Sequence, residues 1–501
     1  MYRRILQLFG HGVIYGFGSV ASKLIAIVML PVIIRYLPPQ SYGLAEVTLT
    51  IDLFAAALFR LGLQNAMMRF YYDAPDDAAR EQVGVRVVRT TLALTLVSLT
   101  VGVVLLGAFA HELAAFFLND PRRDEFIWLA ALGLVTSVVY STITATFRLE
   151  KRPTAFLRIS LGNVFASSAL SLYFITELKW GVEGLLLGNF LGYAAMIPIA
   201  GWMQRKYVVP AIDRSLVRPM LRFAIPTIPI AVAFQALTLI DRTIISRVAG
   251  LDELGVYGLA ARFAAVVLIV VTALQLSWQP FAYSIKDDDE ARRSYAIVTS
   301  WFAAGMGWIV SGMALLADPV VRAMATEPYY EATELVPMLA LAAGVYGAYF
   351  LVGIGASRVK RTGWHVAVAG GAVAVSLVAN LALVPEYGAH GAAVAAVLAN
   401  GALAGFMFLR SQRVFHVRYE RLRIARAVVL TGLAIGAAYA LPTGTGLDSW
   451  ASRLALALLW PAVLVASGFV TAPERERIVR LLRRRGRDRD DDDDPTAVVP
   501  A

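Results

Sequence analysis

Charged side chains interrupt several long apolar stretches of this sequence, and they are the groups best able to do chemistry. They comprise four cations and three acids: Lys23, Arg60, Arg242, Arg262, Glu46, Asp52 and Asp241. A charge among apolar residues usually faces a partner or a wet cavity, because its desolvation is costly. Arginine also presents a fork of N–H donors that fits the oxygens of an anion. The four cations are therefore candidates for binding an anionic group.

The acids of this set have two interpretations. At 100° per residue on a helix, Glu46 lies within about 40° of Arg60, and Asp52 lies about 80° from Arg60. Glu46, Asp52 and Asp241 can therefore pair with the cations or exchange a coupling cation. The alternative is that these groups form ion pairs that only hold helices together. For Asp241 and Arg242, which are adjacent in sequence and near the expected outer surface, this structural alternative is favoured.

The elements that carry these residues are predicted to be membrane-spanning helices. The chain has 501 residues, of which 58% are hydrophobic and 16% are charged, whereas soluble proteins carry nearer a quarter charged residues. Apolar runs of about 20 residues suit helices that cross a bilayer, and the ~10-residue alternation of barrel strands is missing. We expect an all-α polytopic membrane protein with about fourteen spans. They are residues 10–35, 43–67, 87–110, 126–147, 155–176, 181–203, 221–246, 254–275, 295–316, 335–356, 364–384, 389–409, 424–441 and 450–470.

Basic residues are concentrated in alternate connections between these spans. The basic connections lie near residues 69–89, 148–152, 205–218, 286–293, 358–361 and 410–426. The positive-inside rule places them, and both termini, in the cytoplasm, so the protein is expected in the cytoplasmic (inner) membrane. Most of the formal net charge of +10 then reflects topology, and no nucleic-acid partner is expected. Arg35 and Arg247 are predicted to be interfacial anchors.

Two halves of the sequence repeat each other. Tyr42-Gly43-Leu44-Ala45 matches Tyr257-Gly258-Leu259-Ala260, and two further pairs of short segments keep nearly the same offset. Six spans per repeat give both halves the same orientation, so a pseudo-two-fold axis along the membrane normal should relate them. The expected domains are a six-helix lobe over 1–204, a second over 205–412, two additional helices over 413–472, and a charged cytoplasmic tail over 473–501 that is partly disordered.

Prolines mark the places where these helices are expected to bend. Pro31 interrupts the first span, and Pro226 with Pro229 interrupts the seventh, because proline removes a helical hydrogen bond. We interpret these positions as hinges, although such kinks are also ordinary in membrane helices. The sequence has no Walker loop, no cysteine and no histidines at metal-ligand spacing, so we expect no catalytic residues, no metal and no cofactor, and we do not expect an enzyme.

Several short motifs occur in order along the chain, beginning with residues 31–44 and Leu61-Gly62-Leu63. They resemble the ends of the first and second helices of the polysaccharide flippases in the multidrug/oligosaccharidyl-lipid/polysaccharide exporter superfamily. Asp241-Arg242-Thr243-Ile244-Ile245 and Gln279-Pro280-Phe281 resemble parts of its seventh and eighth helices. The resemblance implies that a polyprenyl-diphosphate-linked oligosaccharide moves from the inner to the outer leaflet by alternating access. It also places spans one, two, seven and eight around a central cavity, where Lys23, Arg60 and Arg262 would bind the diphosphate.

The same resemblance implies the partners. These are the lipid-linked oligosaccharide, membrane lipids, and a glycan polymerase or glycosyltransferase of the same pathway, and a monomer is favoured. Two alternatives stay open. A cation-coupled small-molecule exporter would need an acidic cavity. A membrane-embedded polymerase or glycosyltransferase would usually need a large hydrophilic loop with catalytic carboxylates, and the predicted connections are short.

Overall fold

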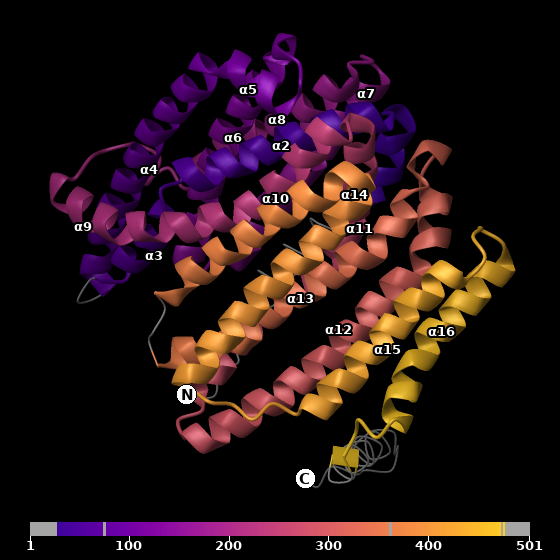
Figure 1. The fold of residues 1–501 in the computed structure, drawn as a ribbon. Coiled ribbons are helices and arrows are strands. Elements are labelled where there is room, and N and C mark those ends of the chain that lie inside the picture. The colour runs from indigo at the N-terminus through magenta and orange to yellow at the C-terminus, as the bar shows by residue number, and fades with distance from the viewer. Residues whose placement is uncertain (1–27, 74–76, 360–362, 472–473, 476–501) are drawn as a thin grey trace, which may run out of the picture.

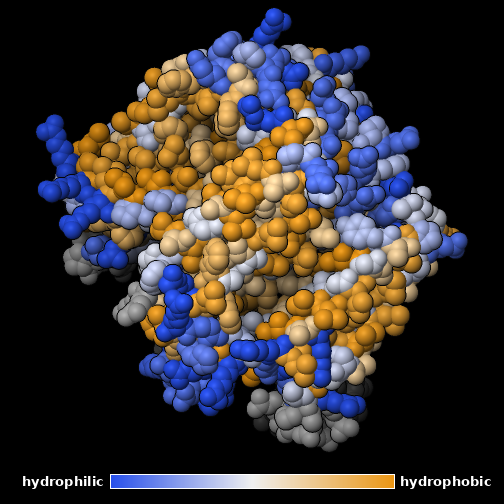
Figure 2. Space-filling view, viewed as in Figure 1, coloured by the Kyte–Doolittle hydropathy of each residue, from blue (hydrophilic) through white to orange (hydrophobic). Residues whose placement is uncertain are grey.

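The computed structural model of the protein describes residues 28–73, 77–359, 363–471 and 474–475. Every regular element in these ranges is a helix (Figure 1), which confirms the predicted all-α class. Twelve of the described helical segments are long and apolar enough to cross a membrane. In Figure 2, hydrophilic atoms gather along the upper right and lower left edges, and hydrophobic atoms cover much of the surface between them, as a belt facing lipid would require.

The first half of the chain supplies helices α2 to α8. Their bounds are α2 Pro39–Phe59, α3 Leu63–Tyr71, α4 Asp77–Ala108, α5 Ala110–Phe117, the short 3-10 helix η1 Pro121–Arg123, α6 Glu125–Leu149, α7 Pro153–Thr176 and α8 Gly181–Met203. Proline stands at the first position of α2 and of α7, where its fixed φ suits a helix start and no hydrogen bond is lost.

The second half supplies helices α9 to α16. Their bounds are α9 Arg214–Ala224, η2 Ile225–Thr227, α10 Ile228–Val248, α11 Leu251–Ser284, α12 Asp288–Met324, η3 Glu327–Tyr329, α13 Ala332–Arg358, α14 Trp364–Val414, α15 Arg421–Ala440 and α16 Leu447–Ala466. The side chains of Asp213 and Asp287 accept hydrogen bonds from the backbone N–H groups of Ser215 and Glu290, respectively. Each carboxylate therefore caps the helix that follows it.

The count of fourteen spans stays a prediction. Helix α14 is 51 residues long but turns at Gly388, where φ is 53° and ψ is −133°, so it covers two of the predicted spans. Most of the first predicted span, together with Lys23, lies outside the described residues. Residues 28–36, which include the end of that span, are helical and the helix continues through Pro31. The domain boundaries and the pseudo-two-fold axis likewise stay predictions, and so does the state of the tail beyond residue 475.

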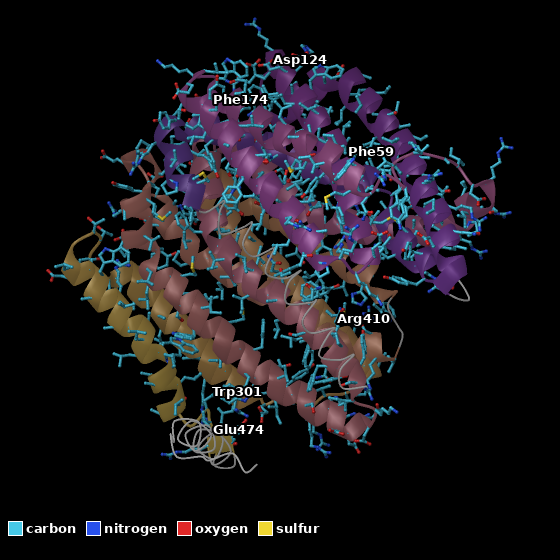
Figure 3. The ribbon with its side chains drawn as sticks, turned by 180° about the vertical axis from the view of Figure 1, so that it is seen from behind. Phe59, Asp124, Phe174, Trp301, Arg410 and Glu474 are labelled. Carbon is cyan, nitrogen blue, oxygen red and sulfur yellow. The ribbon has the colours of Figure 1, made fainter. Side chains whose placement is uncertain are left out.

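Helices α15 and α16 pack on α12, and the chain after α16 is fixed to the same helix. The Trp301 indole N–H donates to a Glu474 carboxylate oxygen at 3.2 Å, and both residues lie at the lower end of the molecule in Figure 3. Arg423 of α15 contacts the same carboxylate at 3.0 Å. At the other end of α16, the fully buried Arg453 donates to the Leu315 carbonyl oxygen of α12 at 2.9 Å. These contacts fix α15, α16 and the segment around Glu474 to α12.

Candidate functional site

Helix α2 lies directly against the start of α11, and glycines allow this close approach. A side-chain carbon at Gly43 would overlap the Leu251 carbonyl oxygen, and one at Gly255 would overlap the Pro39 carbonyl oxygen. Only glycine lets two helix backbones come this near. The two Tyr-Gly segments that repeat in the sequence thus meet in space. We call this contact of α2 with α10 and α11 the seam, and Glu46, Arg242 and Arg262 lie in it.

One carboxylate of the seam binds two arginines. The Glu46 Oε1 atom accepts from Arg262 Nη2 at 2.8 Å and from its Nε at 3.1 Å. The Oε2 atom accepts from Arg242 Nε and Nη2, both at 3.3 Å. The Glu46 side chain is 6% exposed, and those of Arg242 and Arg262 are 14% and 42% exposed. The three groups carry one net positive charge, and Arg262 is the member that remains reachable.

Asp241 does not share this ion pair, although it is adjacent to Arg242. Its Oδ1 atom accepts from Asn380 Nδ2 at 2.8 Å and from the Ser376 hydroxyl at 3.4 Å. Its Oδ2 atom accepts from the Tyr257 hydroxyl at 3.2 Å. These contacts join α10 to α11 and α14, as expected of a buried carboxylate that holds a bundle together.

Asp52 and Arg60 belong to a second group of buried polar side chains, formed by α2, α6 and α8. Arg60 and Ser137 are the charged and polar neighbours of Asp52, and Tyr193 faces both charges. Asp52 is 5% exposed. Three buried atoms, Asp52 Oδ1, Arg60 Nε and Ser137 Oγ, have no hydrogen-bond partner within the described part of the chain. We call these four residues the polar cluster, and they present unused hydrogen-bonding capacity inside the first half of the molecule.

The structure thus groups the predicted residues in two places. Glu46, Arg242 and Arg262 meet in the seam, and Asp52 and Arg60 meet in the polar cluster, whereas Asp241 forms an ion pair in neither and is held by Tyr257, Ser376 and Asn380. Several polar partners of these residues were not predicted from the sequence: Tyr257, Ser376, Asn380, Ser137 and Tyr193. The spacing of Ser376 and Asn380, four residues apart in an apolar run, is a signal that could have found two of them. Ser137 is one of many hydroxyl residues on its helix and Tyr193 lies on another helix, so spacing singles out neither of them.

The predicted hinge of the seventh span coincides with a break in the helix. The 3-10 turn η2 contains Pro226, and Pro229 lies in the first turn of α10. A second break separates α2 from α3, where Leu61 and Gly62 have φ of 49° and 63°. The resemblance placed a helix end at Leu61-Gly62-Leu63, whereas the predicted span 43–67 ran through it. A side-chain carbon at Gly62 would overlap Thr227 Oγ1. The two breaks therefore pack against each other.

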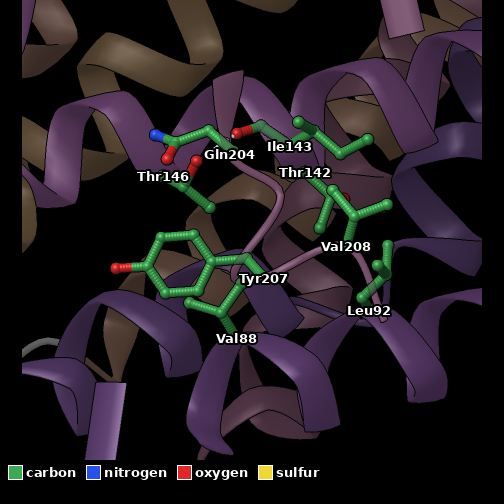
Figure 4. Close-up of a pocket in the computed structure, with 8 residues that line it drawn as sticks. All are labelled: Val88, Leu92, Thr142, Ile143, Thr146, Gln204, Tyr207 and Val208. Carbon is green, nitrogen blue, oxygen red and sulfur yellow. Dashed lines mark hydrogen bonds between the residues drawn. The ribbon is translucent and has the colours of Figure 1, made fainter. Parts of the chain in front are cut away.

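A small apolar pocket lies elsewhere, between α4, α6 and the chain after α8. Figure 4 shows its lining: Val88, Leu92, Thr142, Ile143, Thr146, Gln204, Tyr207 and Val208. Its volume is about 10 Å³, which is at the lower limit for a single water molecule. This pocket has no room for a transported molecule.

The sequence of this chain is similar to those of proteins that build polysaccharides. It matches the family described as "Polysaccharide biosynthesis protein" over residues 32–334, more than half of the chain. It is 23% identical to the succinoglycan biosynthesis transport protein ExoT of Rhizobium meliloti, covering 64% of this chain and 62% of that protein. It is 25% identical to the amylovoran biosynthesis protein AmsL of Erwinia amylovora, covering 47% and 62%. The chain therefore spans less than two thirds of the length of either relative.

The fold is similar to those of solved membrane transporters. The structure titled "Lipid II flippase MurJ, inward closed conformation" has a TM-score of 0.68 at 12% identity, covering 91% of this chain and 99% of that chain. An inward-facing multidrug resistance MATE family transporter of the MOP superfamily has a TM-score of 0.62 at 15% identity, covering 81% and 96%. At these identities the likeness establishes the fold, and the chemistry has to be argued from the residues.

Proposed function

We propose that this chain, which belongs to the polysaccharide biosynthesis protein family, moves a lipid-linked oligosaccharide across the cytoplasmic membrane by alternating access. The substrate would be carried on a polyprenyl diphosphate and would serve the synthesis of a cell-surface polysaccharide. Family membership supports the pathway, and the transporter-like fold supports movement rather than covalent chemistry. The seam and the polar cluster supply the argument for an anionic headgroup.

The observation that carries this proposal is the excess of positive charge in the seam. One glutamate faces two arginines, and the Arg262 side chain is 42% exposed. A diphosphate offers more negative charge and more acceptor oxygens than a carboxylate, so it can compete with Glu46 for both guanidinium groups. Arg60 of the polar cluster supplies a further cation, and Lys23 completes the proposed set.

The seam also suggests how binding is coupled to movement. With Glu46 paired and the α2 and α11 backbones in contact, the predicted outer end of the path is shut. A headgroup that displaces Glu46 from Arg242 and Arg262 would weaken the ion pairs that hold α2 to α10 and α11. The outer end would then open while the substrate is bound, as alternating access requires. The breaks at η2 and at Gly62 would absorb the change in helix direction.

A cation-coupled small-molecule exporter is the second candidate, and one observation favours it. Asp52 in the polar cluster has an oxygen atom without a partner among the described residues, and a buried carboxylate of this kind can bind a proton or a metal cation. Such a site can also drive a flippase, so it does not by itself decide the substrate. The substrate class is decided by whether the transported molecule is anionic or cationic.

Transport by the purified protein in liposomes tests the proposed substrate. We expect movement of a polyprenyl-diphosphate-linked sugar between leaflets, measured by its accessibility to a membrane-impermeant enzyme, and no uptake of a cationic dye under an imposed proton or sodium gradient. Empty liposomes and heat-denatured protein serve as controls. Dye transport without movement of the lipid-linked sugar would establish the exporter instead.

A further inference from the structure

Helix α9 carries an arginine face that the proposed transport path does not use. Arg214, Arg218 and Arg222 recur every four residues and fall within about 80° of one another around the helix. All three are exposed, while Met220 and Ala224 on the opposite face are fully buried. In Figure 1 the helix lies at the left edge of the molecule, beside α3 and α4.

The charge of this face is not neutralised by the protein. Within the described residues, no carboxylate forms an ion pair with Arg214, Arg218 or Arg222. The acids nearby are engaged elsewhere: Asp213 with Arg86 at 3.3 Å, and Glu150 with Lys206 at 2.7 Å. A concentrated positive charge with no internal partner is free to bind an external anion.

The arginine face borders a hollow that can hold such an anion. The described residues around it are Arg218, Pro219, Arg222 and Phe223, and its volume is about 430 Å³. The guanidinium carbon of Arg69, from α3, lies 5.5 Å from the centre of the Phe223 ring. A second helix thus brings a fourth exposed cation to the same place.

Apolar residues at the end of α9 indicate that the anion belongs to a lipid. Phe223 and Ile225 are 38% and 52% exposed, and α9 continues through η2 into the membrane-spanning α10. The arginines therefore lie at the edge of the apolar belt, on the side predicted to be cytoplasmic. Arginine at this depth reaches lipid phosphates while apolar neighbours contact the acyl chains.

The position of the hollow favours the transported lipid over bulk phospholipid. Ala224, the last residue of α9, and Thr227, the last residue of η2, pack against Gly62. Arg60 of the polar cluster lies two residues before Gly62, with its Nε atom unpartnered among the described residues. The segment that follows the hollow thus contacts the helix break beside Arg60, which is a cation of the proposed transport path.

We propose that the α9 hollow is a loading site that binds the diphosphate headgroup of the lipid-linked oligosaccharide in the inner leaflet before transport. Arg218 and Arg222 bind the diphosphate, with Arg69 and Arg214 adding to the local potential. This inference rests on the proposed function, since it takes the transported lipid as the ligand.

Binding of a fluorescent polyprenyl diphosphate to the full-length protein in phosphatidylcholine nanodiscs tests the loading site. The test variant is Arg218→Gln/Arg222→Gln. The matched control, Arg205→Gln/Arg421→Gln, removes two exposed arginines from the same predicted side. We expect the test variant to bind at least about tenfold more weakly, because a charge-assisted contact is lost at each position. The control should stay within about twofold of wild type, and Arg218→Lys/Arg222→Lys should recover part of the affinity.

Competition distinguishes the sources of the phosphate. Excess phosphatidylglycerol or free inorganic diphosphate should displace little of the bound lipid. If phosphatidylglycerol displaces the probe as well as unlabelled polyprenyl diphosphate does, the hollow is a general anionic-lipid surface. If inorganic diphosphate does so, the hollow is a site for a soluble anion. Either result overturns the proposal. If the Arg218→Gln/Arg222→Gln variant binds the lipid as wild type does and translocates the lipid-linked sugar normally, the loading site is refuted and the proposed function still stands. Failure of the wild type to translocate the sugar would instead remove the proposed function.

Discussion

At the scale of single residues, Glu46 has the most consequential environment in the molecule. It is the shared acceptor of Arg242 and Arg262, and these arginines come from two different helices of the second half of the chain. Removing one partner of a buried ion pair leaves uncompensated charge and typically costs about 3–5 kcal/mol. Here the stranded groups would be two neighbouring cations that repel each other, so the seam should loosen.

Replacement of Glu46 by Gln should therefore open the predicted outer end of the transport path. The chain contains no cysteine, so a single Thr50→Cys substitution can report this opening. Thr50 is buried one turn along α2 from Glu46. We expect a membrane-impermeant maleimide to label this cysteine several-fold faster in the Glu46→Gln background.

The control for this measurement is Glu112→Gln, which neutralises an exposed acid of α5. It should leave the labelling rate of the Thr50→Cys protein unchanged. Equal labelling of the Glu46→Gln and Glu46 proteins would mean that the ion pairs do not keep the seam shut.

At the scale of helices, the proposed movement depends on the two adjoining breaks, η2 and the turn at Gly62. Gly62 has φ of 63°, a conformation that costs most other residues about 1–2 kcal/mol. Its backbone also packs against the η2 turn that contains Pro226. The direction of α3 and the direction of α9 are thus fixed by one contact.

Substitution of Gly62 by Ala should lower the thermal stability of the protein in detergent and slow transport. The added methyl group meets both an unfavourable backbone conformation and the Thr227 hydroxyl. Gly401→Ala is the matched control, because Gly401 lies in α14 with open space around it. Alanine there should be neutral or slightly stabilising, as in other helices. Equal melting temperatures for the two variants would show that the break at Gly62 is not strained by a side chain.

At the scale of the whole molecule, the sequence predicted the all-α fold and the polysaccharide biosynthesis family, and both are confirmed. Apolar runs that are long enough to span a bilayer leave helices as almost the only choice, so this level of structure is encoded locally. The resemblance placed a helix end at Leu61-Gly62-Leu63, but the left-handed conformation of Gly62 was not predicted, because glycine is common in membrane helices. Its packing against Ala224 and Thr227 is visible only in the structure.

The candidate site was predictable in its residue types but not in its pairing. Charges in apolar runs identified Glu46, Arg242 and Arg262, whereas their mutual contact depends on how α2, α10 and α11 pack. Sequence spacing places residues around one helix, and it carries no information on which face meets another helix. For the same reason Asp241 and Arg242, adjacent in the chain, could not be assigned to separate networks.

The predicted topology is tested by reporters fused to truncated chains. Fusions near Arg205, Lys286 and Arg418 should report the cytoplasm, and fusions near Lys179 and Glu386 should report the opposite side, because arginine and lysine are retained on the cytoplasmic side during insertion. Alkaline phosphatase and a fluorescent protein give opposite signals and control for each other. Reporters in two directly adjacent connections, such as those near Lys179 and Arg205 or near Glu386 and Arg418, that report the same side would contradict the span count, and the first pair also tests the side assigned to α9.

The cationic site proposed for the lipid diphosphate is tested most directly by measuring translocation of a polyprenyl-diphosphate-linked sugar in liposomes. The proteins compared with wild type are Arg60→Ala and Arg262→Ala. Equal amounts of folded, inserted protein are compared, with Arg421→Ala as the control for loss of an exposed arginine. We predict that both site variants lose translocation by about tenfold or more, since each removes a charge-assisted contact worth about 1.5–3 kcal/mol, and that the control retains it. Wild-type rates for both site variants would contradict a cationic site for the lipid diphosphate.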